Sequence, residues 1–293
     1  MERFVQYLVA GLSAGSAYAL VALGLVLVYQ ASRVLNFAHG DVAALATFVA
    51  YSLLAAQLPF GVAVTLAILT GGVVAVLFYF GILVPAQRRD ANLLGQVILT
   101  LGLGLVLQGV AAFVWGTEPQ PFRFPLSDTR IWRLGMVSMS ELAVGKLVVG
   151  LLASLLLYVL VQRTRTGLAM RAISENLPAA QTLGIPTRRL LALNWGVAAA
   201  LGATAGILLA PSVFLDPYFM LDPFLKGFAA AILGGLNSLP GAILGGLLLG
   251  IAESLASAYI AIQFKNTLAF LIIVLVLLVR PEGLLGREFK ERV

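Results

Sequence analysis

Long apolar segments recur along this chain, and they constrain its fold more than any other feature. Five of them carry few charges and are long enough to cross the hydrocarbon core of a bilayer, which is about 30 Å thick. They cover residues 7–29, 62–84, 93–115, 142–162 and 190–210. Hydrocarbon offers no hydrogen-bond partners to the backbone, and a helix satisfies its own N–H and C=O groups within one segment. The pattern therefore predicts an all-α integral membrane protein.

The composition agrees with a membrane protein and excludes several kinds of site. Of the 293 residues, 60% are hydrophobic and 11% are charged, whereas soluble domains carry about 25% charged residues. The chain has no cysteine and a single histidine, His39, which excludes disulfides, thiolate chemistry and a multi-histidine metal site. The net charge of +6 is explained by cytoplasmic loops that face anionic lipid, so no nucleic-acid partner is expected.

The remaining apolar runs are short or interrupted. Residues 42–57 are short for a span, and residues 224–236 are too short to cross the bilayer at 1.5 Å per residue. The sequence GGLNSLPG at 234–241 breaks the second run before residues 242–261 and 266–279 follow. We expect about eight transmembrane helices plus one broken or re-entrant segment, in a single transmembrane domain over residues 1–293.

The most polar long stretch is residues 163–189, which lies between two apolar segments. It carries five arginines, so it is expected on the cytoplasmic side of the membrane. Two short helices are predicted there, at 167–175 and 177–184. Asn176 is a candidate cap for the second helix, and Gly184 is a candidate terminator. This stretch is either an ordinary connector or a docking element for a soluble cytoplasmic partner.

The positive-inside rule orients the other loops. We expect residues 30–41, residues 85–92 and the C-terminus inside, with the N-terminus and residues 116–141 and 211–223 outside. The outer insert at 116–141 holds Arg123, Arg130 and Arg133. These arginines form either a solvated face or a surface for an acidic partner.

Two interrupted segments, NFAHGD at 36–41 and LKGFAAAILGGLNSLPG at 225–241, sit at roughly corresponding places in the two halves of the chain. Paired broken segments of this kind indicate a transport site near the middle of the membrane. The candidate pathway residues are Asn36, His39, Gly40, Asp41, Gly234, Gly235, Asn237, Gly241 and Glu253.

Each of these candidates also has a structural interpretation. His39 is expected to be a hydrogen-bonded structural residue before it is a proton carrier. Asp41 is either a cap on the short helix that follows it or part of the pore wall. Glu253 lies inside an apolar span, where it can pair with Lys226 or Lys265, face a partner subunit, or be protonated. The glycines either permit close helix packing or form a flexible gate.

Four motifs together resemble the permease subunits of high-affinity branched-chain amino-acid ABC importers. The motifs are NFAHGD (36–41), RTGLAMRAISENLPAAQTLGI (165–185), AILGGLNSLPGAILGG (231–246) and RPEGLLG (280–286). The resemblance covers essentially the whole chain, and it is closer to the H-type subunit of the leucine/isoleucine/valine system. It implies the permease fold of branched-chain amino-acid and sugar importers, located in the bacterial inner membrane.

The resemblance also implies a set of partners. A second, similar permease subunit would pair with this chain, two cytoplasmic ATPases would drive it, and a periplasmic binding protein would deliver the amino acid. ATP and Mg²⁺ would then bind the ATPases, so this chain would be a transport subunit without a cofactor. The family's coupling helix, with its E-A-A…G pattern, maps with looser spacing onto Glu175, Ala179, Ala180 and Gly184, and Arg171 and Asn176 belong to the same stretch.

Other functions remain open at this point. A related permease for urea or short amides would share these motifs. A stand-alone secondary transporter would need carboxylates for coupling ions near the middle of the membrane, and only Glu253 and Asp41 are available there. An enzyme is disfavoured, since the sequence has neither a Walker A motif nor a plausible nucleophile–base set.

Overall fold

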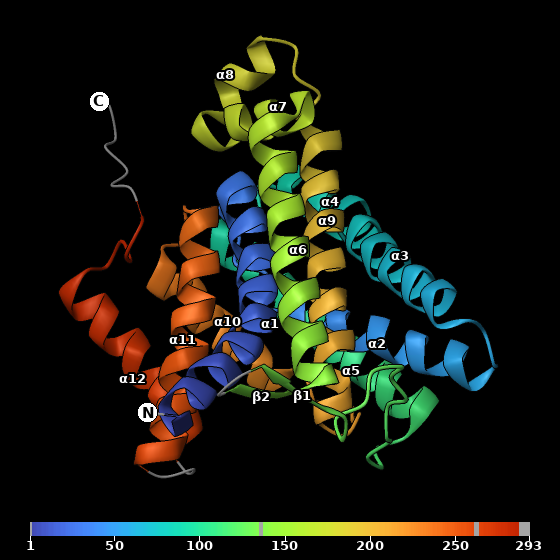
Figure 1. Ribbon diagram of the computed structural model, residues 1–293. Coiled ribbons are helices and arrows are strands. Elements are labelled where there is room, and N and C mark those ends of the chain that lie inside the picture. Colours follow the sequence, from blue (N-terminus) through green and yellow to red (C-terminus); the bar gives the residue numbers. More distant parts are fainter. Residues whose placement is uncertain (1, 135–136, 261–263, 287–293) are drawn as a thin grey trace. The chain divides into compact units, whose positions relative to one another are not determined.

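The computed structural model describes residues 2–134, 137–260 and 264–286, and these are mostly helical (Figure 1). The longer helices are α1 (Glu2–Ser32), α2 (His39–Ala55), α3 (Phe60–Phe78), α5 (Leu93–Trp115), α6 (Glu141–Arg163), α9 (Thr187–Leu209), α10 (Leu221–Gly234), α11 (Leu239–Tyr259) and α12 (Phe264–Val279). The short elements are α4 (Val84–Arg88), α7 (Arg165–Glu175), α8 (Leu177–Thr182), a π-helical turn at Tyr79–Leu83 and a 3-10 turn at Ala210–Ser212.

Six helical segments in the described part of the chain are long and apolar enough to cross a membrane. They are Arg3–Ser32, Phe60–Arg88, Leu93–Trp115, Glu141–Arg163, Thr187–Ser212 and Leu239–Tyr259. Shorter apolar helices lie at His39–Ala55 and Thr267–Val279. The expected all-α membrane architecture is therefore confirmed, with some of the expected spans present as shorter helices.

The helix that starts at Phe60 continues beyond the proline where its span was expected to end. Pro85 falls in the first turn of α4, directly after the π-helical turn Tyr79–Leu83. Proline lacks an N–H, and its ring clashes with the carbonyl four residues earlier in a regular α-helix. The wider π-helical turn contains that carbonyl, on Gly81, and so lets the helix run on to Arg88.

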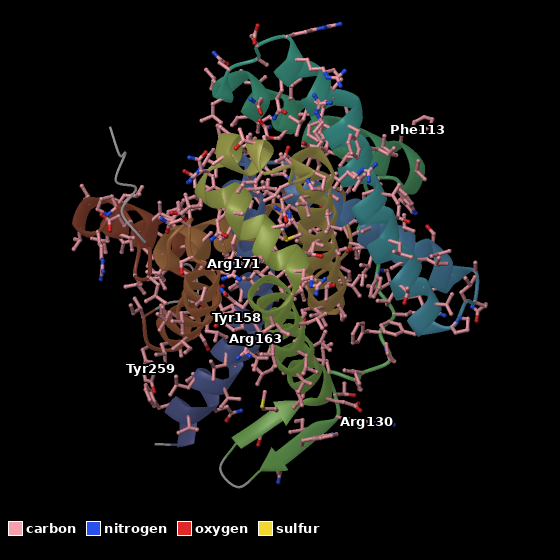
Figure 2. All side chains as sticks on the ribbon, turned by 90° about the horizontal axis from the view of Figure 1, so that it is seen from above. Phe113, Arg130, Tyr158, Arg163, Arg171 and Tyr259 are labelled. Carbon is pink, nitrogen blue, oxygen red and sulfur yellow. The ribbon has the colours of Figure 1, made fainter. Side chains whose placement is uncertain are left out.

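The insert after α5 contains a feature that the sequence did not predict. Strands β1 (Ile131–Leu134) and β2 (Val137–Ser140) form an antiparallel hairpin in which Trp132 pairs with Met139. Arg130 lies beside this hairpin (Figure 2). The β-branched Ile131 and the aromatic Trp132 are the local signal for a strand, but four residues are too few for a firm prediction.

The chain forms two compact units, each made of several chain segments. The first contains Met1–Val26, Leu126–Ser154 and Leu225–Val293; the second contains Leu27–Pro125 and Leu155–Phe224. Helices α1, α6 and α10 each contribute to both units.

Small residues bring the helices of the first unit into close contact. A Cβ added at Gly15 of α1 would lie 2.7 Å from the carbonyl oxygen of Gly246, and one at Gly250 of α11 would lie 2.4 Å from that of Gly11. Two GxxxG pairs, Gly11 with Gly15 and Gly246 with Gly250, therefore face each other and let the two helices approach closely. Ser16 adds a polar link to α6, since its hydroxyl donates to the carbonyl of Lys146 at 3.1 Å.

The second unit is built around α2, α3 and α9, which pack against one another, while α5 packs on α2. Gly206 of α9 faces Thr47 and Ala43 of α2, and Gly71 of α3 faces Ala46 of α2. Trp195 of α9 is buried and contacts the rings of Phe78 and Tyr79, whose centroids lie 5.8 and 6.4 Å from its own. By contrast, the ring of Phe113 on α5 is 92% exposed and projects away from its helix (Figure 2).

Candidate functional site

The first candidate segment joins α1 to α2 and belongs to the second unit. Its backbone is held from the side by Thr100 of α5, which is fully buried. The Thr100 hydroxyl accepts from the N–H of Phe37 at 3.1 Å and lies 3.3 Å from the carbonyl oxygen of Leu35. Thr100 is 63 residues away from Phe37 in the sequence. Its hydroxyl replaces a backbone hydrogen bond that is lost where the helix is interrupted.

Two residues of this segment, Asn36 and His39, carry polar side-chain atoms that make no hydrogen bond within the described residues. Both residues are buried, with 5% and 1% of their surface exposed. Within the described part of the chain, Asn36 Oδ1 and His39 Nε2 have no hydrogen-bond partner. The expectation that His39 is a hydrogen-bonded structural residue before it is a proton carrier stays a prediction, since Nε2 is only one of its two ring nitrogens. Unsatisfied buried polar atoms are rare in folded proteins, and Asn36 Oδ1 and His39 Nε2 share this property with Asn194 Oδ1 and Trp195 Nε1 of α9.

The neighbours of this pair leave little space. The Phe224 Cβ lies 2.9 Å from where a Cβ at Gly40 would stand. Both ring atoms Cε1 and Nε2 of His39 lie 3.0 Å from the corresponding position at Gly202 of α9. Gly40 and Gly202 are therefore glycines because the chain at 224 and the His39 ring occupy the space that a side chain would need.

Asp41 does not cap α2. The residue before the helix is Ala38, which makes no side-chain cap bond. Asp41 lies in the first turn of α2, where the helix dipole favours a negative charge. Its Oδ1 accepts from Nε2 of Gln108 on α5 at 2.9 Å. The capping interpretation is therefore corrected to a side-chain link between α2 and α5.

Sequence reasoning missed the α5 side of this segment. Thr100, Gly104 and Gln108 are spaced four residues apart, so they lie on one face of α5. Gly104 leaves room for the Asp41 carboxylate, since a Cβ there would lie 2.4 Å from Oδ2. Polar and small residues at helical spacing in an otherwise apolar span were the available signal.

The second candidate segment, 234–241, belongs to the first unit and breaks the chain between α10 and α11, as predicted. Gly235 has φ +104°, in the left-handed region that favours glycine. Ser238 caps α11 by accepting from the N–H of Gly241 at 3.1 Å. Gly234 and Gly241 face each other, because a Cβ at either would lie within 2.2 Å of the carbonyl oxygen of the other. Asn237 lies between them in the turn.

The C-terminal motif RPEGLLG is docked on this break. The N–H groups of Leu284 and Leu285 donate to the carbonyls of Leu233 and Gly234 at 2.8 and 3.0 Å. Those carbonyls belong to the last turn of α10, where carbonyl groups have no hydrogen-bond partners within their own helix. We call residues 280–286 the C-terminal clasp. Sequence reasoning noted the motif but missed this contact, because the two segments are about 50 residues apart and the contact is made by backbone atoms.

Glu253 of α11 forms an ion pair with Lys226 of α10. Oε1 and Nζ are 2.9 Å apart, and the two side chains are 4% and 3% exposed. The ammonium group also lies 5.7 Å from the centroid of the Tyr18 ring. The predicted structural pairing of Glu253 is confirmed with Lys226, while the side chain of the alternative partner, Lys265, lies outside the described residues.

The polar stretch after α6 folds as the two predicted helices, α7 and α8, which lie beyond the ends of α6 and α9 (Figure 1). Thr164 caps α7 by accepting from Gly167 at 3.0 Å, and Asn176 caps α8 by accepting from Ala179 at 3.0 Å. Gly184 has φ +75° and follows the end of α8. The capping role of Asn176 and the terminating role of Gly184 are confirmed.

The two alanines of this stretch point in different directions. Ala179 is exposed, but Ala180 is 2% exposed and therefore packed inside the protein. The expectation that both alanines meet a partner is corrected, because Ala180 faces the chain's own interior. Helix α7 buries Gly167, Met170 and Ile173 on one face and exposes Leu168, Arg171 and Glu175 on the other.

Replacing Asn176 with alanine is expected to destabilise α8 by about 1 kcal/mol, because the side chain that accepts the N–H of Ala179 is lost. Amide hydrogen exchange should become faster in α8 and remain unchanged in α9. Asn176→Ser is the matched control, since serine caps helices as well as asparagine does. Equal exchange in the alanine and serine variants would contradict the capping role.

The sequence of this chain is similar to those of known transport proteins. Residues 7–279 match the family described as "Branched-chain amino acid transport system / permease component". The permease protein LivH of the high-affinity branched-chain amino acid transport system of Escherichia coli (strain K12) is 35% identical, over 99% of this chain and 98% of LivH. The corresponding protein BraD of Pseudomonas aeruginosa is 33% identical over 99% and 98% of the two chains.

A more distant relative and a solved structure extend the comparison. A probable branched-chain amino acid transport permease protein LivH of Methanocaldococcus jannaschii is 32% identical over 93% of this chain and 89% of its own. The structure described as "PsaBC from Streptococcus pneumoniae in complex with Fab" superposes with a TM-score of 0.50 at 16% identity, covering 94% of this chain and 91% of the other. At this identity the structural match concerns the fold alone.

Proposed function

This chain belongs to the branched-chain amino acid transport permease family, and we propose that it is the permease subunit of an ATP-driven importer of branched-chain or related hydrophobic amino acids in the bacterial inner membrane. The alignments with LivH and BraD, which cover 99% of this chain and 98% of each relative, support the proposal. The six candidate spans make the chain a multi-pass membrane protein. In this role the chain moves the amino acid and does not itself hydrolyse ATP.

The observation that carries the proposal is the folded helix pair α7–α8 between two membrane-spanning helices. A connector of this length needs no capped helices, whereas an element that transmits force benefits from them. Two large apolar side chains of this stretch are exposed, Leu168 of α7 at 61% and Leu183 at the end of α8 at 79%. In a polar segment outside the bilayer, these side chains favour contact with another protein. We propose that α7–α8 docks on a cytoplasmic ATPase through this face, with Arg171, Glu175 and Ala179.

The remaining subunits follow from the same proposal. A second, similar permease subunit pairs with this chain in the membrane lipid, and two ATPases hold ATP and Mg²⁺. A periplasmic binding protein delivers the amino acid to the outer face, where Arg123, Arg130 and Arg133 are exposed. An acidic surface on that protein would complement these arginines.

The pathway within this chain is proposed to include both interrupted segments. The buried, unsatisfied Asn36 Oδ1 and His39 Nε2 support this role for the first segment. The turn from Gly234 to Gly241 supports it for the second, since glycines there allow the backbone to adopt a left-handed turn and close contacts. Lys226 and Glu253 lie on the helices on either side of that turn.

Replacing Ala179 with tryptophan tests the docking face. Because Ala179 is exposed, the bulky ring should not disturb the fold, but it should obstruct docking and reduce ATP-driven leucine uptake by about tenfold or more. Uptake is measured in membrane vesicles that contain the complete importer, and ATPase retention is measured by co-purification. Ala179→Ser is the matched control and should transport normally. Normal uptake and normal ATPase retention in the tryptophan variant would refute docking through this face.

Competition experiments on the same vesicles test the substrate. Unlabelled isoleucine or valine should suppress uptake of labelled leucine, because one pathway carries all three. Urea and short amides should not compete. Uptake of labelled urea without uptake of leucine would instead support an amide permease.

A further inference from the structure

Arg33 stands at a position where its backbone is strained. It follows the last residue of α1, and its N–H donates to the carbonyl of Tyr29 at 2.8 Å. Its φ is +60°, in the left-handed region. Glycine or asparagine is the usual residue at such a helix end, because a longer side chain is disfavoured there. An arginine at this position suggests that its side chain has a use that outweighs the strain.

The side chain of Arg33 reaches α7. Its Nη2 donates to the carbonyl oxygen of Ser174 at 3.4 Å. Ser174 lies in the last turn of α7, where carbonyl groups lack partners in their own helix and a positive charge is favoured by the helix dipole. The guanidinium carbon also lies 5.9 Å from the centroid of the Tyr29 ring, which adds a cation–π attraction.

The residues that follow Arg33 lead directly to the first candidate pathway segment. The backbone at Phe37 is held by Thr100 of α5, and α2 begins at His39. Arg33 is thus three residues from Asn36 and six from His39, the two residues with unsatisfied buried atoms. A shift of α7 would therefore act through the Arg33 side chain and move the backbone that precedes Asn36.

We propose that Arg33 is a positioning residue that mechanically links α7 to the 34–41 segment. When the cytoplasmic helix pair moves, Arg33 moves the start of that segment relative to α5, and so changes the surroundings of Asn36 and His39. This inference rests on the proposed function, because it assigns a route by which ATPase movement reaches the pathway. The competing explanation is that Arg33 only ends α1 and provides a positive charge on the cytoplasmic side.

Arg33→Gly separates the two explanations. Glycine accepts the left-handed conformation without strain, so α1 should end as before and thermal stability should be unchanged or higher. If the guanidinium is a mechanical link, the number of amino acids transported per ATP hydrolysed should fall by about tenfold, within the range expected for coupling between sites. ATP hydrolysis and uptake are measured together on the complete importer in proteoliposomes.

Two controls match the two effects of this substitution. Gln57, just after α2, is another left-handed non-glycine residue, at φ +63°, and it is exposed. Gln57→Gly relieves the same kind of strain and should leave the transport ratio unchanged. Arg33→Lys keeps the positive charge but loses the planar fork of donors, so it should restore the ratio only in part. A wild-type ratio in Arg33→Gly, or full restoration by lysine, would overturn the link.

A second measurement does not depend on transport activity. Because the chain has no cysteine, Leu35→Cys introduces a single thiol into the segment. Its labelling rate should change several-fold between nucleotide-free importer and importer trapped with ATP and vanadate, and this change should disappear when Arg33→Gly is added. Persistence of the change would contradict the inference. If the wild-type chain neither retains ATPases nor transports leucine, the proposed function itself fails, which is a different result.

Discussion

Glu253→Gln is expected to lower the free energy of unfolding by about 3–5 kcal/mol, because it leaves the Lys226 ammonium buried without its carboxylate. The two charged groups are 2.9 Å apart and both side chains are almost fully buried, so solvent cannot replace the lost interaction. Thermal unfolding of the detergent-solubilised protein should show this loss as a large decrease in Tm. The exposed carboxylate Glu118 provides the matched control, and Glu118→Gln should leave Tm unchanged.

The double variant Lys226→Met with Glu253→Leu should recover most of the stability. Replacing both members of a buried ion pair with apolar residues of similar volume removes the desolvation penalty together with the attraction, and the result is often close to neutral. The two single losses should therefore not add. Additive losses would show that each residue acts through contacts of its own and that the ion pair is not the main interaction between α10 and α11 at this point.

Gly235→Ala is the second substitution with a large expected effect, about 3 kcal/mol or more. A left-handed alanine costs about 1–2 kcal/mol, and forcing an extra methyl group into a packed site costs a further 1–3 kcal/mol. The new Cβ would lie 2.7 Å from both the Glu282 carbonyl oxygen and the Gly286 nitrogen. The substitution should therefore detach the C-terminal clasp from α10, and limited proteolysis should cut after residue 279 more rapidly.

Gly116→Ala isolates the contribution of that contact. Gly116 also has a positive φ, +82°, but no atom lies within 4 Å of an added Cβ. At its φ of +82° and ψ of −178°, in a region that glycine adopts almost alone, its alanine variant should lose only a backbone term of about 1–3 kcal/mol. The difference in Tm between the two variants then measures the steric conflict with the clasp. If Gly235→Ala is no more destabilised than Gly116→Ala and its C-terminus is equally protected, the clasp does not stabilise the end of α10.

The sequence by itself determined the features that depend on local chemistry. The apolar runs predicted the spans because bilayer thickness sets helix length and hydrocarbon requires each helix to satisfy its own backbone. The break at 234–241 followed from its glycines and Pro240, which interrupt a helix wherever it is placed. The cap at Asn176 and the end at Gly184 followed from bonds that span three or four residues.

Only the tertiary structure decided which distant groups meet. Gln108 bonds Asp41 from another helix, and the clasp reaches α10 through backbone atoms that carry no sequence signal. Burial of Ala180 beside exposed Ala179 depends on where α8 packs against the chain. The link from Arg33 to Ser174 joins residues 141 positions apart. Such contacts depend on the packing of whole helices, so the residue types alone do not specify them.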